Sequence, residues 1–234
     1  MTRSPIAVAL DGPDLATITA WAAAAGPSVS TMKVGLETYL RDGAAAVRAV
    51  REAAPGCALF LDLKLHDIPN TVAGASRSVA AIAPDFLTVH ASGGSAMIRA
   101  AADALPDTRI VAVTVLTSMS EDDLRAVGLL GPAIDAVRRL AALSVAAGAR
   151  AIVCSPQEVA AVRAEVGDAA VLITPGVRPD PLGGSDDQAR VATPERALAD
   201  GADLLVIGRP ITAAADVAMA ARELAQRLAG LSAP

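Results

Sequence analysis

The sequence predicts an α/β fold, a (β/α)8 TIM barrel formed by a single domain. Eight short apolar or β-branched runs recur along the chain, and alanine-rich amphipathic segments separate most of them. Strands that alternate with helices pair in parallel through right-handed crossovers. The length of 234 residues also suits such a barrel, which commonly uses about 200 to 250 residues as one domain. We therefore expect one barrel over residues 1–234.

The expected strands are short, continuous apolar runs, as is typical of parallel strands buried on both faces. In chain order they cover residues 6–10, 31–34, 59–63, 86–90, 110–116, 151–154, 171–174 and 204–207. The clearest amphipathic helices between them are expected at 44–54, 70–83, 134–147 and 156–166. An open doubly wound sheet is the alternative, but a Gly-x-Gly-x-x-Gly motif does not follow the first strand.

Composition favours a cytoplasmic enzyme. The net charge is −5 and lysine and arginine form no cluster, so we expect no nucleic-acid partner. No apolar run approaches the roughly 18 residues of a membrane span, and residues 1–5 lead into a strand without a signal peptide. We therefore expect no membrane partner. The sequence has only two cysteines, which do not make a disulfide framework. We expect Cys154 to be a small buried hydrophobic residue. With only two histidines, a histidine-rich metal site is not expected.

The most informative segment is 62–71, which follows the apolar run 58–61. Asp62 and Lys64 are two residues apart, so they share one face of the expected strand. Charges at the end of a buried strand are costly to desolvate unless they are paired, and they often mark a site. A structural ion pair beneath a loop is the alternative. The second carboxylate, Asp67, and the turn-forming residues after it favour a functional site.

Charged residues recur where the expected strands end, which is where barrels place their active sites. Asp11 follows the first strand, Lys33 lies at the end of the second, and Asp62, Lys64 and Asp67 follow the third. In such an alternating set, opposite neighbours favour the ionised forms. A cationic lysine is suited to stabilise a carbanion and protonate it, whereas Schiff-base chemistry needs a neutral amine. The carboxylates could instead bind Mg²⁺, and the lysines argue against that.

Two later strand ends carry polar groups. Gly208, Arg209 and Pro210 follow the eighth strand, where barrels often bind phosphate. Arginine offers a bidentate fork for phosphate, and glycine lets backbone amides approach closely. Thr117 and Ser118 follow the fifth strand and are further candidates.

The long segment after the seventh strand, 176–190, is rich in Gly, Pro and Asp and contains Arg178 and Gln188. It could be a surface loop with no role. Barrel loops of this length often cover an active site, so the more specific hypothesis is a lid that closes over substrate.

Taken together, these motifs resemble the bacterial type of the orotidine 5′-phosphate decarboxylase family over nearly the whole chain. The strongest match is FLDLKLHDIPNT at 60–71. Supporting matches are VALD at 8–11, KVG at 33–35, VHASGG at 89–94, VTVLTS at 113–118, TPGVR at 174–178, DQ at 187–188 and VIGRPIT at 206–212. Their order and spacing together make the resemblance specific.

The resemblance implies decarboxylation of orotidine 5′-monophosphate to uridine 5′-monophosphate in pyrimidine nucleotide synthesis. Lys64 would protonate C6 of the pyrimidine as carbon dioxide leaves, and Asp62 would lie against the substrate carboxylate. Lys33 and Asp67 would complete the charged network. No metal or organic cofactor is implied.

The resemblance also implies binding roles. Asp11 and Lys33 would hold the ribose hydroxyls, and Thr117, with Ser118, would meet the base. Gln188, Gly208 and Arg209 would hold the phosphate, with Arg178 in the closing loop. Asp67 and Thr71 would reach into the site of a neighbouring subunit, which implies an obligate homodimer.

Two other functions remain open. Mg²⁺-dependent sugar-phosphate decarboxylases and aldolases on the same barrel share an Asp-x-Lys-x-x-Asp element, but the position matching Lys33 is acidic in those relatives. A nucleotide-binding protein that has lost catalysis is the second, and it would have little need of Asp62, Lys64 and Asp67 together.

Overall fold

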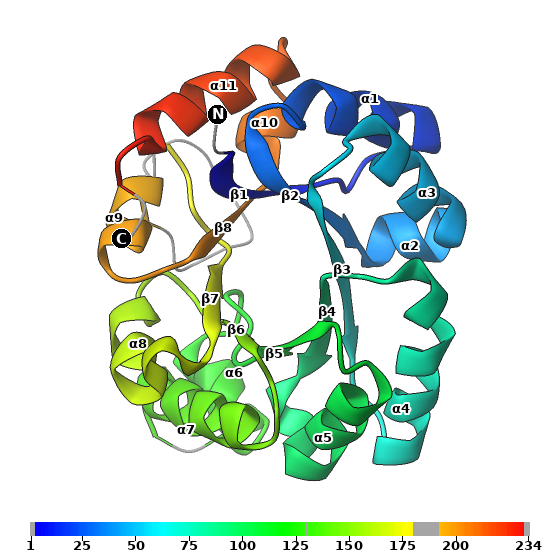
Figure 1. Ribbon diagram of the computed structural model, residues 1–234. Helices are drawn as coiled ribbons and strands as arrows, with labels where there is room; N and C mark the ends of the chain where they lie inside the picture. Colours follow the sequence, from blue (N-terminus) through cyan, green and yellow to red (C-terminus); the bar gives the residue numbers. More distant parts are fainter. Residues whose placement is uncertain (1–2, 130, 180–191, 232–234) are drawn as a thin grey trace.

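A closed barrel of eight parallel strands forms the centre of the molecule, and Figure 1 shows the computed structural model along the barrel axis. The structure describes residues 3–129, 131–179 and 192–231. Sequence neighbours are neighbours in the sheet, and β1 pairs with β8 to close it. The strands are β1 (Ser4–Ala9), β2 (Val29–Gly35), β3 (Ala58–Leu65), β4 (Phe86–His90), β5 (Arg109–Val113), β6 (Ala151–Val153), β7 (Val171–Thr174) and β8 (Leu204–Ile207). The prediction of a (β/α)8 barrel is confirmed.

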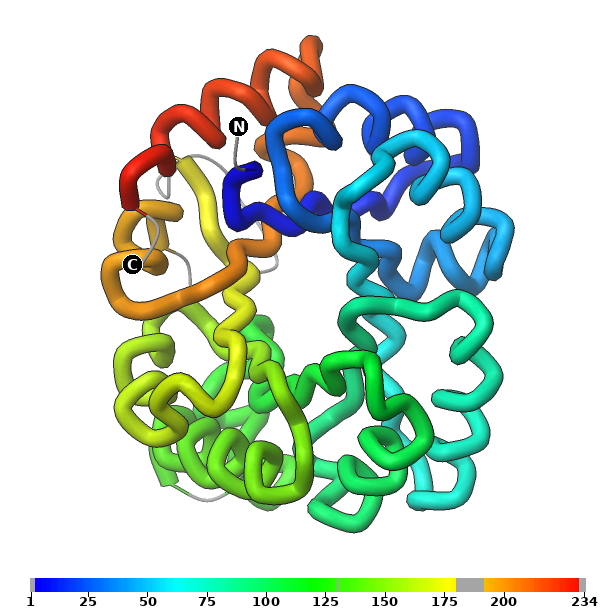
Figure 2. The backbone as a smooth tube through the Cα atoms, in the orientation of Figure 1, coloured from blue at the N-terminus to red at the C-terminus, as the bar shows by residue number. Residues whose placement is uncertain are grey.

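Helices form an outer layer around the barrel, as the tube in Figure 2 shows. They are α1 (Leu15–Ala25), α2 (Leu36–Asp42), α3 (Ala44–Ala53), α4 (Pro69–Ser78), α5 (Gly94–Ala104), α6 (Glu121–Ala126), α7 (Ala133–Ala146), α8 (Val159–Val166), α9 (Pro194–Ala199), α10 (Arg209–Thr212) and α11 (Val217–Leu228). Local chemistry determines where several begin. Asp14 accepts a hydrogen bond from Thr17 N at 2.8 Å at the start of α1, and Ser120 and Asp123 form a capping box at the start of α6.

Two hydrophobic clusters hold the layers together. The larger one packs helices against the outside of the barrel and includes Val8 and Leu61. The smaller one fills the barrel interior and consists of Ala7, Phe60, Phe86, Val111, Ala151, Ile173 and Leu204. Members of the two clusters alternate along β1 and β3, for example, because successive side chains point to opposite faces of the sheet. The rings of Phe60 and Phe86 lie 5.7 Å apart between centroids.

Two predicted elements differ most from the structure, and the bounds of the others agree to within three residues at each end. The fifth strand was expected over 110–116, but β5 ends at Val113. Val113 pairs with His90 on one side and Val153 on the other, and these are the last residues of β4 and β6, so the ladder cannot continue. The helix expected over 70–83 is interrupted. After α4 ends at Ser78, a short 3₁₀ helix, η1 (Ala80–Ile82), carries the chain to Ala83 with φ of 49°.

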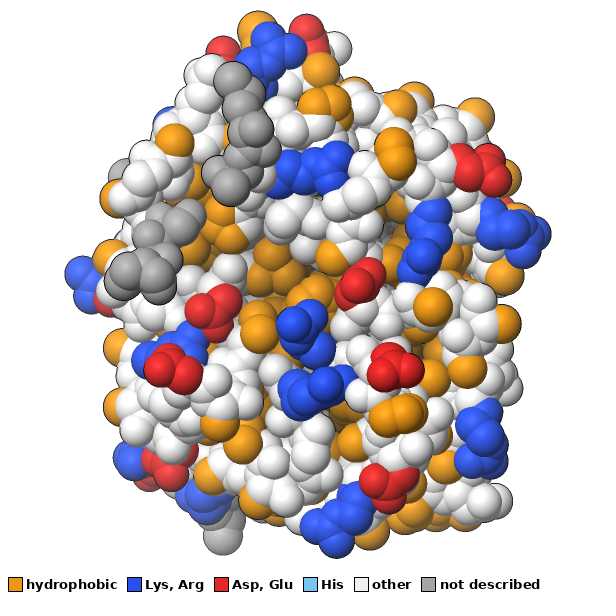
Figure 3. All heavy atoms as spheres, viewed as in Figure 1, with side chains coloured by type: hydrophobic (Ala, Val, Ile, Leu, Met, Phe, Trp, Pro, Cys, Tyr) orange, Lys and Arg blue, Asp and Glu red, His pale blue; other side chains and the backbone are white. Residues whose placement is uncertain are grey.

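The surface is charged but mixed in sign. On the face in Figure 3, acidic and basic side chains are interspersed around a patch of hydrophobic side chains near the barrel axis. Among the described residues, no helix is long and apolar enough to cross a membrane. A single domain over the full 1–234 stays a prediction.

Candidate active site

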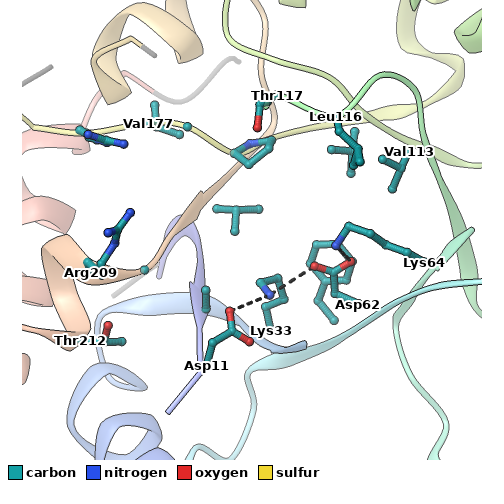
Figure 4. A pocket seen from close by; sticks show the side chains of 18 of the residues that line it. Asp11, Lys33, Asp62, Lys64, Val113, Leu116, Thr117, Val177, Arg209 and Thr212 are labelled. Atoms are coloured by element: carbon teal, nitrogen blue, oxygen red, sulfur yellow. Dashed lines mark hydrogen bonds and ion pairs between the residues drawn. The ribbon is translucent and has the colours of Figure 1, made fainter. Parts of the chain in front are cut away.

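A cavity of about 560 Å³ opens at the C-terminal ends of the strands. Its described lining residues come from every strand except β4 and β7 or from the loops and short helices that follow the strands, and it extends to Phe60 of the inner cluster. Figure 4 shows Asp11, Lys33, Asp62 and Lys64 in a row, with Val113 and Leu116 near Lys64 and Arg209 at the opposite end from Lys64. The expectation that polar groups converge at this end of the barrel is confirmed.

A row of alternating charges lies along the wall that β1, β2 and β3 form (Figure 4). Lys33 Nζ lies 3.3 Å from Asp11 Oδ2 and 3.2 Å from Asp62 Oδ2. Lys64 Nζ lies 2.8 Å from Asp62 Oδ1. Lys33 and Asp62 are buried, with exposures of 7% and 9%. Each oxygen of the Asp62 carboxylate therefore faces a different ammonium.

The network keeps its buried members ionised. Burial alone would lower the pKa of Lys33, but the carboxylates of Asp62 and Asp11 outweigh it and raise that pKa above its usual range. Burial likewise acts to raise the pKa of Asp62, and the ammonium groups of Lys33 and Lys64 outweigh it and lower that pKa. Mutual pairing therefore offsets the cost of desolvating these charges.

β3 is not a regular strand where it supplies Asp62 and Lys64. Leu61 pairs with Leu87 and Leu65 with Val89, so four steps along β3 match two along β4, which is the mark of a bulge. Lys64 has φ of 50°, a left-handed conformation that costs a non-glycine residue roughly 1 to 2 kcal/mol. The side chains of Asp62 and Lys64 meet as predicted, but a bulge, not simple strand alternation, brings them together.

Gly35 at the end of β2 approaches the charged row closely. A Cβ at this position would clash with Asp11 Oδ1 and lie 2.9 Å from Lys33 Nζ. A glycine is therefore required for Asp11 and Lys33 to pair as they do. The sequence contains this glycine in the KVG match at 33–35, but nothing there indicates its close approach to Asp11 and Lys33.

The next two predicted site residues after Lys64 in the chain lie outside this cavity. Asp67 and Thr71 are exposed, at and just after the β3–α4 connection. Asp67 Oδ1 accepts a hydrogen bond from Ile68 N at 2.6 Å, directly before α4. Neither residue lines the pocket formed by its own chain.

The opposite wall holds most of the residues predicted to bind phosphate and base. Thr117, Arg178, Gly208 and Arg209 line the cavity, and Arg209 begins the short helix α10. Ser118 is exposed and is not among the lining residues. Gln188 lies outside the described residues, as does most of the predicted lid, 176–190.

An apolar surface near Lys64 was not predicted. Val113, Val115, Val153 and Val206 line the cavity, and Figure 4 places Val113 and Leu116 on the Lys64 side. β-branched residues are the default choice in strands, so nothing in the sequence distinguished these valines as site residues.

The cation between the two carboxylates of the row is a lysine. Asp11 and Asp62 both contact Lys33 Nζ. Within the part of the chain that the structure describes, no group of three or more His, Cys, Asp or Glu side chains could hold a metal ion. Cys154 is fully buried, and burial, with Glu158 adding to it, raises the pKa of its thiol to about 12.

Known proteins resemble this chain over nearly its full length. The model of the orotidine 5′-phosphate decarboxylase / HUMPS family matches residues 4–224. Orotidine 5′-phosphate decarboxylase of Thermobifida fusca (strain YX) is 68% identical over 225 residues, which cover 96% of each chain. The protein of the same name from Anaeromyxobacter sp. (strain K) is 55% identical over 224 residues, covering 95% of this chain and 97% of the relative. A crystal structure of orotidine 5′-phosphate decarboxylase from Lactobacillus acidophilus has a TM-score of 0.82 at 34% identity, covering 95% of this chain and 98% of that one.

Proposed function

The chain belongs to the orotidine 5′-phosphate decarboxylase / HUMPS family, and we propose that it decarboxylates orotidine 5′-monophosphate to uridine 5′-monophosphate. The observation that carries this proposal is the ion pair of Asp62 and Lys64 at 2.8 Å, on the wall of a cavity whose far side holds Arg209. That arrangement offers a proton donor at one end of a nucleotide and a phosphate ligand at the other. The names of the relatives support the same reaction.

In the proposed reaction, the bond between C6 and the carboxylate carbon breaks and its electron pair stays on C6. Lys64 donates a proton from Nζ to C6, carbon dioxide leaves, and the lysine regains its proton from solvent. Asp62 lies against the substrate carboxylate, and Lys33 holds the second Asp62 oxygen. The apolar surface at Val113 and Val115 favours neutral carbon dioxide over a carboxylate, because a charge is poorly solvated there.

Binding of the nucleotide is assigned to the remaining polar groups. Asp11 and Lys33 hold the ribose hydroxyls, and Thr117, with Ser118, meets the base. Gln188, Gly208 and Arg209 hold the phosphate, with Arg178 closing over it. The placement of Thr117, Arg178, Gly208 and Arg209 in one cavity with the charged row supports this assignment.

We further propose that the enzyme is a cytoplasmic homodimer that needs no cofactor and shares its active sites between subunits. Asp67 and Thr71 would complete the site of the partner. Their exposure at the rim that carries the cavity supports this, as does the presence of large exposed hydrophobic side chains on the protein. Ile68 is 66% exposed and Leu40 on α2 is 78% exposed. Burying them between subunits would be favourable.

The test is turnover of orotidine 5′-monophosphate by the purified protein, followed by ultraviolet absorbance with and without EDTA. We expect turnover that EDTA leaves unchanged. No turnover by a folded protein that still binds uridine 5′-monophosphate would indicate a nucleotide-binding protein without catalysis. Mg²⁺-dependent activity on a sugar phosphate would instead favour the metal-dependent relatives, against which the position of Lys33 argues.

A further inference from the structure

Thr88 on β4 contacts the charged row from behind. Its side chain is fully buried and does not line the cavity, to which β4 contributes no described residue. Its hydroxyl donates a hydrogen bond to Asp62 Oδ1 at 3.0 Å and accepts one from the backbone N–H of Lys64 at 2.7 Å. A threonine hydroxyl has one donor and two acceptor positions, so both bonds can exist together.

The second of these bonds lies at the bulge in β3. The register between β3 and β4 shifts between Leu61 and Leu65, so Lys64 N–H has no regular ladder partner there. The Thr88 hydroxyl takes that place and stabilises the left-handed backbone of Lys64. A backbone conformation of this kind persists only where its surroundings hold it.

The first bond sets the orientation of the Asp62 carboxylate. Asp62 Oδ1 receives Thr88 Oγ1 and Lys64 Nζ, while Oδ2 faces Lys33 Nζ at 3.2 Å. Rotation of the carboxylate would break contacts at both oxygens. One buried hydroxyl thus holds the backbone of the proposed proton donor and the side chain of its partner.

We propose that Thr88 is a positioning residue that places Lys64 and Asp62 for the reaction without touching the substrate. This role rests on the proposed decarboxylation. A purely structural threonine would contribute to folding alone, and its loss would not alter the rate of the folded enzyme. The positioning role instead predicts a loss in kcat, because a misplacement of about 1 Å can cost on the order of 10²-fold in rate.

The test compares variants that differ by one hydroxyl. Thr88→Val is nearly isosteric and removes both hydrogen bonds, whereas Thr88→Ser keeps the hydroxyl. Thr108→Val is the matched control. Thr108 lies directly before β5 at the other end of the barrel, is also buried, and donates a hydrogen bond to Pro84 O at 2.8 Å.

We expect kcat of Thr88→Val to fall on the order of 10²-fold. KM and the affinity for uridine 5′-monophosphate should change little, since the phosphate ligands are untouched. Thr88→Ser should retain most of kcat, and Thr108→Val all of it.

Equal losses of kcat in Thr88→Val and Thr88→Ser would overturn the proposal, as would an unchanged kcat in folded Thr88→Val. If Thr88→Val does not fold, Thr88→Ala, which also lacks the hydroxyl, is measured in its place. Crystal structures of wild type and variant provide a readout that does not depend on the reaction. We expect Lys64 Nζ to leave Asp62 in the variant. If the wild type does not decarboxylate orotidine 5′-monophosphate, the proposed function fails, and a variant that keeps the Lys64 conformation and its 2.8 Å contact would still refute the positioning role.

Discussion

The two ends of the barrel hold carboxylates in different ways. At the amino end, Asp85 and Asp203 each directly precede a strand, and each accepts a backbone N–H of the neighbouring strand at 2.7 Å, from Leu59 and Leu172 respectively. At the carboxyl end, Asp62 contacts two ammonium groups on the wall of a cavity. A carboxylate bonded to backbone holds a strand in register, whereas one held by side chains at a cavity is placed to meet a ligand.

The cations at the two ends differ as well. Near the amino end, Arg163 donates to Gly201 O at 2.9 Å and also pairs with Asp203. Lys33 and Lys64 are the only lysines in the sequence, and both lie in the charged row. A guanidinium does not release its proton in proteins, whereas an ammonium can. The end that uses lysine is therefore the end equipped for proton transfer.

Replacing the proposed proton donor should have the largest effect. General acids contribute typically 10² to 10⁴ in rate, so we expect Lys64→Ala to lower kcat by up to about 10⁴-fold. Lys64→Arg, which keeps the charge, should be similarly impaired because a guanidinium does not release its proton. Binding of uridine 5′-monophosphate should remain measurable by calorimetry. Substantial turnover by either variant would remove Lys64 from its role as acid.

Removing Arg209 should have the next largest effect on activity. A hydrogen bond to a charged group contributes about 1.5 to 3 kcal/mol, which corresponds to roughly 10- to 10²-fold in kcat/KM. Steady-state kinetics of Arg209→Ala measures this loss. Arg196→Ala serves as a control, since Arg196 lies on α9 and pairs with Asp200 at 2.7 Å outside the cavity. An unchanged kcat/KM in Arg209→Ala would place the phosphate elsewhere.

Changes at the amino end should affect stability alone. Asp203→Ala leaves Leu172 N–H without its side-chain partner, which should lower the free energy of unfolding by about 1 to 3 kcal/mol. Urea denaturation measures this, with Asp168→Ala as control. Asp168 is fully exposed and contacts Arg163 only at 3.7 Å, so little change is expected there. A fall in kcat/KM of folded Asp203→Ala would contradict the prediction that changes at the amino end affect stability alone.

The charged row should also make the free energy of unfolding depend on pH, and we expect this effect to be smaller than those described above. Because Lys33 and Lys64 lower the pKa of Asp62 in the folded state, unfolding lets this carboxyl bind a proton more readily. Its contribution is present above the ordinary value of 3.8 and is lost as pH falls through the lower folded-state pKa. Denaturation at several pH values should show a steeper loss below pH 4 for wild type than for Asp62→Ala. Parallel curves would contradict this.

The number and order of the strands follow from the local sequence pattern, but the exact ends of several elements do not. Strands buried on both faces are largely apolar, so all eight could be recognised from short apolar or β-branched runs in the sequence. The end of β5 depends on where β4 and β6 end, which is information from distant parts of the chain. The helix expected to continue to 83 ends at Ser78, and the 3₁₀ helix η1 that follows it leads to Ala83 in a left-handed conformation, where the sequence has no glycine.

The charged residues of the site were predictable for a different reason. A charged residue at the end of a buried apolar strand is uncommon and therefore informative, so Asp11, Lys33, Asp62 and Lys64 stand out. Thr88 does not, because threonine is common in strands and nothing in the sequence indicates the bulge in β3 or the contact with Asp62.

The most direct test of the difference between the two ends is kcat/KM of Asp62→Ala and Asp85→Ala for orotidine 5′-monophosphate, expressed per folded molecule. Both substitutions remove an aspartate carboxylate, one at each end of the barrel. The account predicts a loss of at least about 10²-fold for Asp62→Ala and wild-type kcat/KM for Asp85→Ala, whose cost should appear only in the free energy of unfolding. Equal losses at both positions, or an active Asp62→Ala enzyme, would contradict it.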